Sequence, residues 1–192
     1  MKKNYYCIIG IVLLAISLLN ACSPPKAEAI SGKSVEADSQ VQAAKPIEGI
    51  EKGQLPPDFS VKTVDNSTLT LSQLREQKKP TLLFFWATWC PSCAEDFAVV
   101  KSIYPKYSDK VNYVAIDLDT TEDIGMIKEY ADNLGIKGIK FAEGNSKVLS
   151  DYKILSTTTK YALDKDGVLL YKGSGAFNEK QWEILFNGML GN

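Results

Sequence analysis

The chain has 192 residues, of which 45% are hydrophobic and 23% are charged, a size and composition that suit one compact domain with short appendages. Its 22 basic and 23 acidic residues give a formal net charge of −1, which argues against a nucleic-acid-binding protein. The sequence contains no histidine, so histidine is excluded both as a general base and as a metal ligand.

Residues 1–22 are similar to a bacterial lipoprotein signal. Two lysines open the segment, residues 5–19 are apolar and uncharged, and small Ala21 precedes Cys22. In such a signal the chain is cut before the cysteine, which is then lipidated. The alternative is an uncleaved membrane anchor, whose apolar run lies at the short end of the ~17–25 residues that a span needs. Both alternatives predict that the rest of the chain is extracytoplasmic and attached to the cell membrane.

Residues 23–50 are rich in Ala, Ser, Lys, Glu and Pro and contain almost no large apolar side chain. They show no sustained periodicity, which is typical of a flexible linker. We therefore expect a folded domain at residues 51–192, tethered to the membrane by this linker.

The first half of the domain predicts a hairpin, a strand and a helix. Residues 59–71 alternate around an Asp-Asn turn, which indicates a β-hairpin, and Ser72 is the expected N-cap of a short helical turn. The continuous apolar run at residues 81–87 is typical of a central strand covered on both faces. From Cys93 to about residue 107, apolar residues recur at helical spacing.

The second half predicts alternating strands and helices. The expected elements are a buried strand at 111–119, a helix at 122–134 stopped by Gly135, a short strand at 139–141, a short helix up to 152, two strands at 159–164 and 168–175 joined by a tight turn at 164–167, and an amphipathic helix at 178–188. This order predicts an α/β domain in which a central mixed sheet carries helices on both faces.

Cys90 and Cys93 are separated by two residues at the junction between a predicted strand and a predicted helix. A structural zinc site needs about four ligands, which one chain with two such cysteines and no histidine does not supply. A purely structural disulfide would close a tiny loop and remove little chain entropy. The helix start favours a redox pair: Pro91 fits the first helical position, and the helix dipole lowers the pKa of a thiol at Cys90. Cys93, one turn further in, is then the resolving thiol.

The stretch "WATWCPSC", preceded by "LPPDFSVKTVDNSTLTLSQL" and followed by "LDKDG", resembles the TlpA/ResA-type thiol–disulfide oxidoreductases of the thioredoxin superfamily. The resemblance extends from about Leu55 to the C-terminus. It implies a thioredoxin fold with an N-terminal β-hairpin extension and an enzyme without metal or other cofactor. It also implies reduction of disulfides in exported proteins, such as apocytochrome c, and a membrane thiol–disulfide electron donor.

Four positions depart from the pattern of that family, one of them Ala98, which stands where relatives have a kinking proline. Phe84 stands where thioredoxins have a buried aspartate, and Asp96 stands where relatives have a glutamate. Asp96 is therefore either the proton acceptor for catalytic Cys93 or an acid that complements the helix dipole. Thr158 replaces a cis-proline in the loop that pairs with an extended substrate, and a trans bond is the default for threonine.

The resemblance also implies a substrate-binding surface around Cys90. Its expected members are Trp89, Pro91, Ser92, Thr157 and Thr158.

Two other functions remain open on the sequence. A peroxiredoxin-like peroxidase needs an arginine that polarises peroxide beside its cysteine, and Arg75 is the only arginine of the chain. A non-enzymatic metal-binding chaperone would use the two thiols without a histidine.

Overall fold

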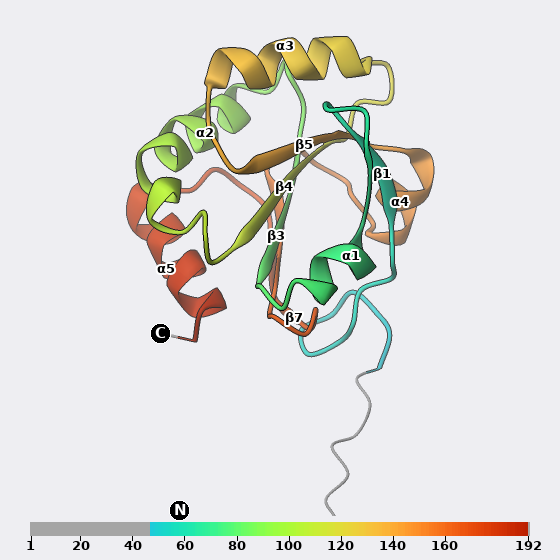
Figure 1. Ribbon diagram of the computed structural model, residues 1–192, viewed down its shortest axis with the longest axis vertical. Helices are drawn as coiled ribbons and strands as arrows, with labels where there is room; N and C mark the ends of the chain where they lie inside the picture. Colours follow the sequence, from blue (N-terminus) through green and yellow to red (C-terminus); the bar gives the residue numbers. More distant parts are fainter. Residues whose placement is uncertain (1–46, 192) are drawn as a thin grey trace, which may run out of the picture. The chain divides into compact units, whose positions relative to one another are not determined.

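The computed structural model describes residues 47–191. The predicted lipoprotein signal with Cys22, and most of the predicted linker, lie outside the described residues. Figure 1 shows the described part as one sheet with helices on both faces. Its elements in chain order are β1 (Ser60–Thr63), β2 (Thr68–Thr70), α1 (Leu71–Glu76), β3 (Thr81–Trp86), α2 (Pro91–Ile103), a 3-10 helix (Tyr104–Lys106), β4 (Asn112–Asp117), α3 (Ile124–Leu134), β5 (Ile139–Glu143), α4 (Ser146–Asp151), β6 (Thr159–Leu163), β7 (Leu169–Gly173) and α5 (Glu179–Met189).

The sheet is mixed, as the sequence predicts, with the strand order β2-β1-β5-β4-β3-β6-β7. The three central strands β5, β4 and β3 are parallel to one another. The outer strands β6 and β7 on one side, and β1 and β2 on the other, run antiparallel to their neighbours. Since the carboxyl ends of parallel strands lie at one edge of a sheet, the segments that follow β3 and β4 meet there.

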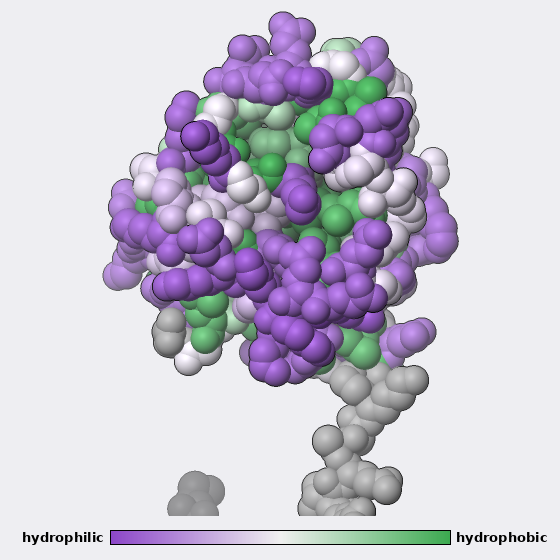
Figure 2. Space-filling view, in the orientation of Figure 1, coloured by the Kyte–Doolittle hydropathy of each residue, from purple (hydrophilic) through white to green (hydrophobic). Residues whose placement is uncertain are grey.

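All six residues of β3 are buried, because its side chains alternate between two apolar cores. Leu82, Phe84 and Trp86 face the core under α2, α3 and α5, whereas Leu83 and Phe85 face the core under α1 and α4. The continuous apolar run therefore marks the central strand correctly. On the face seen in Figure 2, polar residues gather along the rim and the lower part, and apolar residues are visible between them.

The predicted hairpin is confirmed, but the predicted cap of the helix that follows is wrong. Thr70, not Ser72, is the N-cap of α1, because its side chain accepts from the Gln73 N–H while the Gln73 side chain accepts from the Thr70 N–H. This reciprocal pair satisfies two free donors of the helix start. Ser72 lies inside α1, and its hydroxyl and N–H both donate to Asp58.

Two boundaries lie elsewhere than expected. Residues 47–50 fall within the expected linker, yet Ile50 is buried in the core and the Gly49 N–H donates to the Leu55 carbonyl. The third helix begins at Ile124 with Asp123 as its N-cap, so Glu122 belongs to the loop before it.

Within residues 47–191, no helix is long and apolar enough to cross a membrane.

Candidate active site

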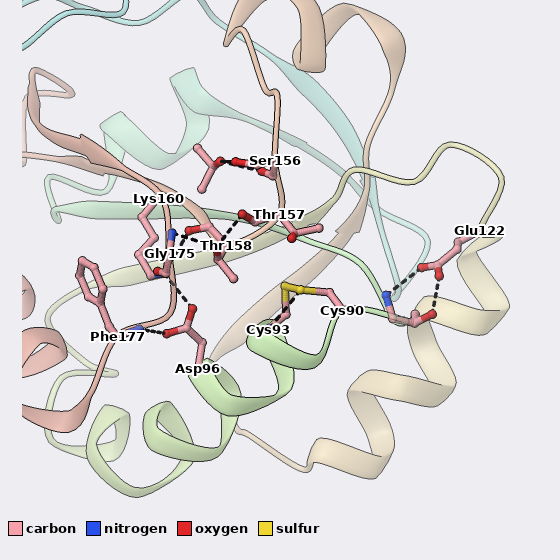
Figure 3. The surroundings of a disulfide bond; sticks show 12 residues. Cys90, Cys93, Asp96, Glu122, Ser156, Thr157, Thr158, Lys160, Gly175 and Phe177 are labelled. Atoms are coloured by element: carbon pink, nitrogen blue, oxygen red, sulfur yellow. Dashed lines mark hydrogen bonds and ion pairs between the residues drawn. A yellow bond between two sulfur atoms is a disulfide. The ribbon is translucent and has the colours of Figure 1, made fainter.

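The two cysteines form a disulfide at the first turn of α2 (Figure 3). Cys90 is the N-cap residue, with extended backbone, and Pro91 is the first helical residue. The Cys93 N–H donates to the Cys90 sulfur over 3.1 Å. The sulfur of Cys90 thus takes the place of the oxygen that usually caps a helix, and free N–H groups together with the helix dipole stabilise negative charge on it.

The surroundings of the two sulfur atoms differ. Cys90 keeps 4% of its surface exposed and Cys93 none. Pro91 and Ser92 are exposed beside Cys90, and Trp89 is 61% exposed. A reaction partner that approaches from solvent therefore meets Cys90 before Cys93.

The segment before Cys90 is fixed by acidic residues that follow β4. The indole N–H of Trp89 donates to Asp119 over 2.8 Å. The Thr88 N–H donates to Glu122 over 3.1 Å, and the Thr88 hydroxyl donates to the same carboxylate. The parallel register of β3 and β4 brings these segments together. The loop that carries Cys90 is therefore attached to the β4–α3 connection.

Asp117, the last residue of β4, lies beneath this connection and is 1% exposed. Burial, and then the adjacent Glu122 carboxyl group, raise the pKa of Asp117 to about 8. Two buried carboxyl groups so close together do not both ionise readily, so Asp117 carries a proton at neutral pH.

The loop opposite the disulfide contains Thr157 and Thr158 (Figure 3). Thr158 is buried and has a φ of 59°, in the left-handed region that β-branched residues rarely adopt. Its hydroxyl donates to the Thr157 carbonyl over 2.6 Å and accepts from the Gly175 N–H over 2.9 Å. The Thr158 hydroxyl is thus engaged within the loop, whereas Thr157 is partly exposed.

Asp96 lies one helical turn after Cys93 and is fully buried. Its Oδ2 accepts from the Lys160 ammonium over 2.8 Å. Its Oδ1 accepts from the Phe177 N–H over 2.8 Å and from the Trp182 indole N–H over 2.9 Å. Burial raises the pKa of Asp96, and the positive charge of Lys160 opposes this shift. Glu95, its neighbour in the sequence, is exposed.

A hollow of about 330 Å³ lies beside the redox pair. Trp89 and Thr157 form the part nearest the cysteines, and the rest is mostly apolar and lined by Leu118, Leu149, Ile154, Leu155 and Ser156. Leu155 is 95% exposed. This face offers an extended polypeptide an apolar contact surface next to Cys90.

Sequence reasoning did not identify Lys160, Asp117, Asp119 or Glu122. A lysine within the buried strand "TKYAL" was the available signal for Lys160, because a buried lysine requires an acceptor. The acidic residues 117–123 follow a strand parallel to β3, which was the available signal for the other three. In the described part of the chain, no group of three or more His, Cys, Asp or Glu residues is arranged to hold a metal ion.

Arg75 is remote from the cysteines. It packs against Gly167 in the turn between β6 and β7, and it donates to the Pro56 carbonyl. That turn follows Leu163, which pairs with Thr81 at the start of β3, whereas Cys90 follows the end of β3. The arginine that a peroxiredoxin-like site requires is therefore not beside Cys90.

Comparison with known proteins agrees with this geometry. The model of the AhpC/TSA family matches residues 53–172. The chain is 30% identical over 136 residues to thioredoxin-like protein YneN of Bacillus subtilis, covering 70% of this chain and 78% of YneN. It is 33% identical over 140 residues to thiol-disulfide oxidoreductase ResA of Oceanobacillus iheyensis, covering 70% of this chain and 71% of ResA.

The fold also matches that of a solved thiol:disulfide interchange protein from Chlorobium tepidum, with a TM-score of 0.63 and 20% identity over 71% of this chain and 95% of the other. A disulfide at the first turn of a helix agrees with the name of ResA, a thiol-disulfide oxidoreductase, and the other sequence relative is named a thioredoxin-like protein. The chain therefore belongs to the AhpC/TSA family and, within the thioredoxin superfamily, to the ResA-like thiol–disulfide oxidoreductases.

Proposed function

We propose that this oxidoreductase is extracytoplasmic, is anchored to the cell membrane, and reduces disulfides in exported proteins. The observation that carries the proposal is the position of Cys90, whose sulfur caps α2 and accepts the Cys93 N–H at 3.1 Å. A thiolate stabilised there is both a good nucleophile and a good leaving group in disulfide exchange.

The reaction begins with the dithiol form. The Cys90 thiolate attacks one sulfur of a substrate disulfide, forming a mixed disulfide and releasing the first substrate thiolate. Cys93 then attacks the Cys90 sulfur, which forms the Cys90–Cys93 disulfide and releases the second substrate sulfur with the proton of Cys93. Two electrons pass to the substrate, and a membrane thiol–disulfide donor must return two electrons to the pair.

The substrate class follows from the surface around Cys90. Trp89, which precedes Cys90, and Thr157, which lies in the loop opposite the disulfide, line the mostly apolar hollow, which supports a polypeptide substrate with apolar residues near its cysteine. An unfolded exported chain exposes such residues, and apocytochrome c before haem attachment is one substrate of this kind.

Trapping of the mixed disulfide tests the exchange reaction. In the full-length chain with Cys7 and Cys22 replaced by serine, Cys93→Ser leaves Cys90 without its resolving thiol, so a covalent complex with a disulfide-containing polypeptide should accumulate. The matched control is Cys90→Ser, which should form no such complex. Equal trapping by both variants would contradict the assigned roles.

The anchor is supported by the similarity of residues 1–22 to a lipoprotein signal. In mass spectrometry the wild type should begin at a lipidated Cys22, whereas Cys22→Ser should lack the lipid and keep residues 1–21, because the cut is made before the cysteine. A wild type with an intact N-terminus and no lipid would favour an uncleaved anchor instead.

A further inference from the structure

A buried ion pair connects the active-site helix to the loop opposite the cysteines. Lys160 of β6 and Asp96 of α2 have no exposed side-chain surface, and their charged atoms are 2.8 Å apart. Phe84, which stands where thioredoxins carry an acid, offers its ring to the lysine ammonium at 4.9 Å from the ring centre. The buried acid of this chain is therefore Asp96 on α2, and its partner is Lys160 on β6.

The hydrogen bonds around Lys160 match an ammonium group. Its Nζ has three acceptors: Asp96 Oδ2 at 2.8 Å, the Gly175 carbonyl at 2.8 Å and the Thr158 carbonyl at 3.1 Å. An ammonium has three donors, one for each acceptor. A neutral amine has two, and its lone pair would face an oxygen. Phe177 and Trp182 add two aromatic rings, with centres 4.5 Å and 5.0 Å from Nζ.

The hydrogen bonds around Asp96 match a carboxylate. Three donors point at its two oxygens, from Lys160, Phe177 and Trp182. Burial alone raises the pKa of Asp96 and lowers the pKa of Lys160, but the donor and acceptor counts favour the charged form of both groups. Tyr113 of β4 is a further buried ionisable side chain near this carboxylate; burial, and then the charge of Asp96, raise its pKa well above its ordinary value.

The pair is placed to act on the redox site. Asp96 follows Cys93 by one turn on the buried side of α2, and Thr158, whose carbonyl binds Lys160, lies across from the disulfide (Figure 3). A lone carboxylate beneath Cys93 would be a base with a variable charge. A carboxylate neutralised by a fixed ammonium has a constant charge, and three donors already bind its two oxygens.

We propose that Lys160 is a positioning residue for disulfide exchange, which keeps Asp96 permanently ionised and holds the Thr158 loop against α2. Asp96 then does not take the proton of Cys93; in the resolving step that proton leaves with the substrate thiolate or to water. This inference rests on the proposed exchange reaction for its role, but the charge state of the pair does not depend on that reaction.

Carbon-13 NMR of the Asp96 carboxyl group in the reduced full-length protein tests the proposal directly. We expect no titration of Asp96 between pH 5 and pH 9. In Lys160→Met the carboxyl loses its counter-charge, so its titration midpoint should rise by about 1–3 pH units, the effect of one nearby opposite charge, and enter this range. The matched control is Lys172→Met on the adjacent strand, which should leave Asp96 unchanged.

The rate at which the reduced protein reacts with a small disulfide supplies the second readout. Lys160→Met should add an ionisation to the pH–rate profile that is absent from the wild type and from Asp96→Asn/Lys160→Met. Titration of Asp96 in the wild type near neutral pH would overturn the proposal, and this measurement remains decisive if Lys160→Met does not fold. A protein inactive in exchange but with a non-titrating Asp96 would instead contradict only the proposed function.

Discussion

At the residue scale, Cys90 and Cys93 differ in hydrogen bonding and in exposure although both lie at the start of α2. Cys90 receives an N–H bond from Cys93 and retains a small exposed edge, whereas Cys93 lies fully within the core under α2. A thiolate is therefore favoured at Cys90, and a reagent from solvent reaches Cys90 more easily.

Alkylation of the reduced chain should follow this difference. With iodoacetamide at pH 7, we expect Cys90 to react roughly tenfold or more faster than Cys93, as for a thiol ionising at least about one pH unit below the free-cysteine value of about 8.5. Mass spectrometry of the peptides measures both rates, and Cys90→Ser gives the rate of Cys93 alone. Faster modification of Cys93 would reverse the assigned roles.

Thr158 occupies a backbone conformation that its relatives' proline does not adopt. Proline fixes φ near −65°, whereas Thr158 has a φ of 59°. The loop in this chain is therefore built around a different backbone, held by the bonds of Thr158 to Gly175 and Lys160. The sequence revealed the substitution but not this conformation.

Thr158→Pro should consequently destabilise the protein, by about 1–3 kcal/mol from forced backbone strain in addition to the loss of both hydrogen bonds of the Thr158 hydroxyl. Thr158→Gly is the matched control: it loses the same two hydrogen bonds but relieves about 1 kcal/mol of left-handed strain, so it should be more stable than the proline variant. Urea unfolding measures both. A proline variant as stable as the glycine variant would contradict the observed loop.

At the element scale, the sequence predicted the sheet and its helices well where apolar periodicity decides the structure. The run at residues 81–87 became β3, and Gly135 ends α3 in the left-handed conformation. It failed at the starts of α1 and α3, where Thr70 and Asp123 compete with nearby polar residues for the N-cap, but it predicted the start of α2 at Cys90 and Pro91. The lysine partner of Asp96 comes from β6 and the carboxylate partner of Thr88 from the β4–α3 connection, and such tertiary pairs leave little local signal.

The β4–α3 connection also makes stability depend on pH. Folded Asp117 keeps its proton up to about pH 8, whereas an unfolded aspartate loses it near 3.9. Between these values the folded state binds the extra proton, so stability falls as pH rises, by up to about 1.4 kcal/mol per pH unit for one proton. Above the folded pKa this fall should level off.

Asp117→Asn should remove that dependence. We expect the free energy of unfolding of this variant, measured by urea titration from pH 5 to pH 9, to fall less steeply than that of the wild type. Asp109→Asn replaces an exposed aspartate and should retain the wild-type slope. Parallel curves for the wild type and Asp117→Asn would show that Asp117 is ionised throughout.

At the scale of the whole molecule, the redox domain follows a predicted membrane tether in the sequence. The domain brings the ends of β3 and β4, the first turn of α2 and the Thr158 loop to one edge of the sheet. The direction of electron flow depends on the relative stability of the dithiol and the disulfide, which the same motif sets differently in different proteins.

The reduction potential of the Cys90–Cys93 pair tests the central claim most directly. It is measured by equilibrating the chain, with Cys7 and Cys22 replaced by serine, in dithiothreitol buffers and counting free thiols by mass spectrometry. We predict a reversible two-electron couple near the value of thioredoxin, about −270 mV, as suits a reductant. A value near that of the oxidant DsbA, about −120 mV, or the absence of a reversible couple, would contradict the account.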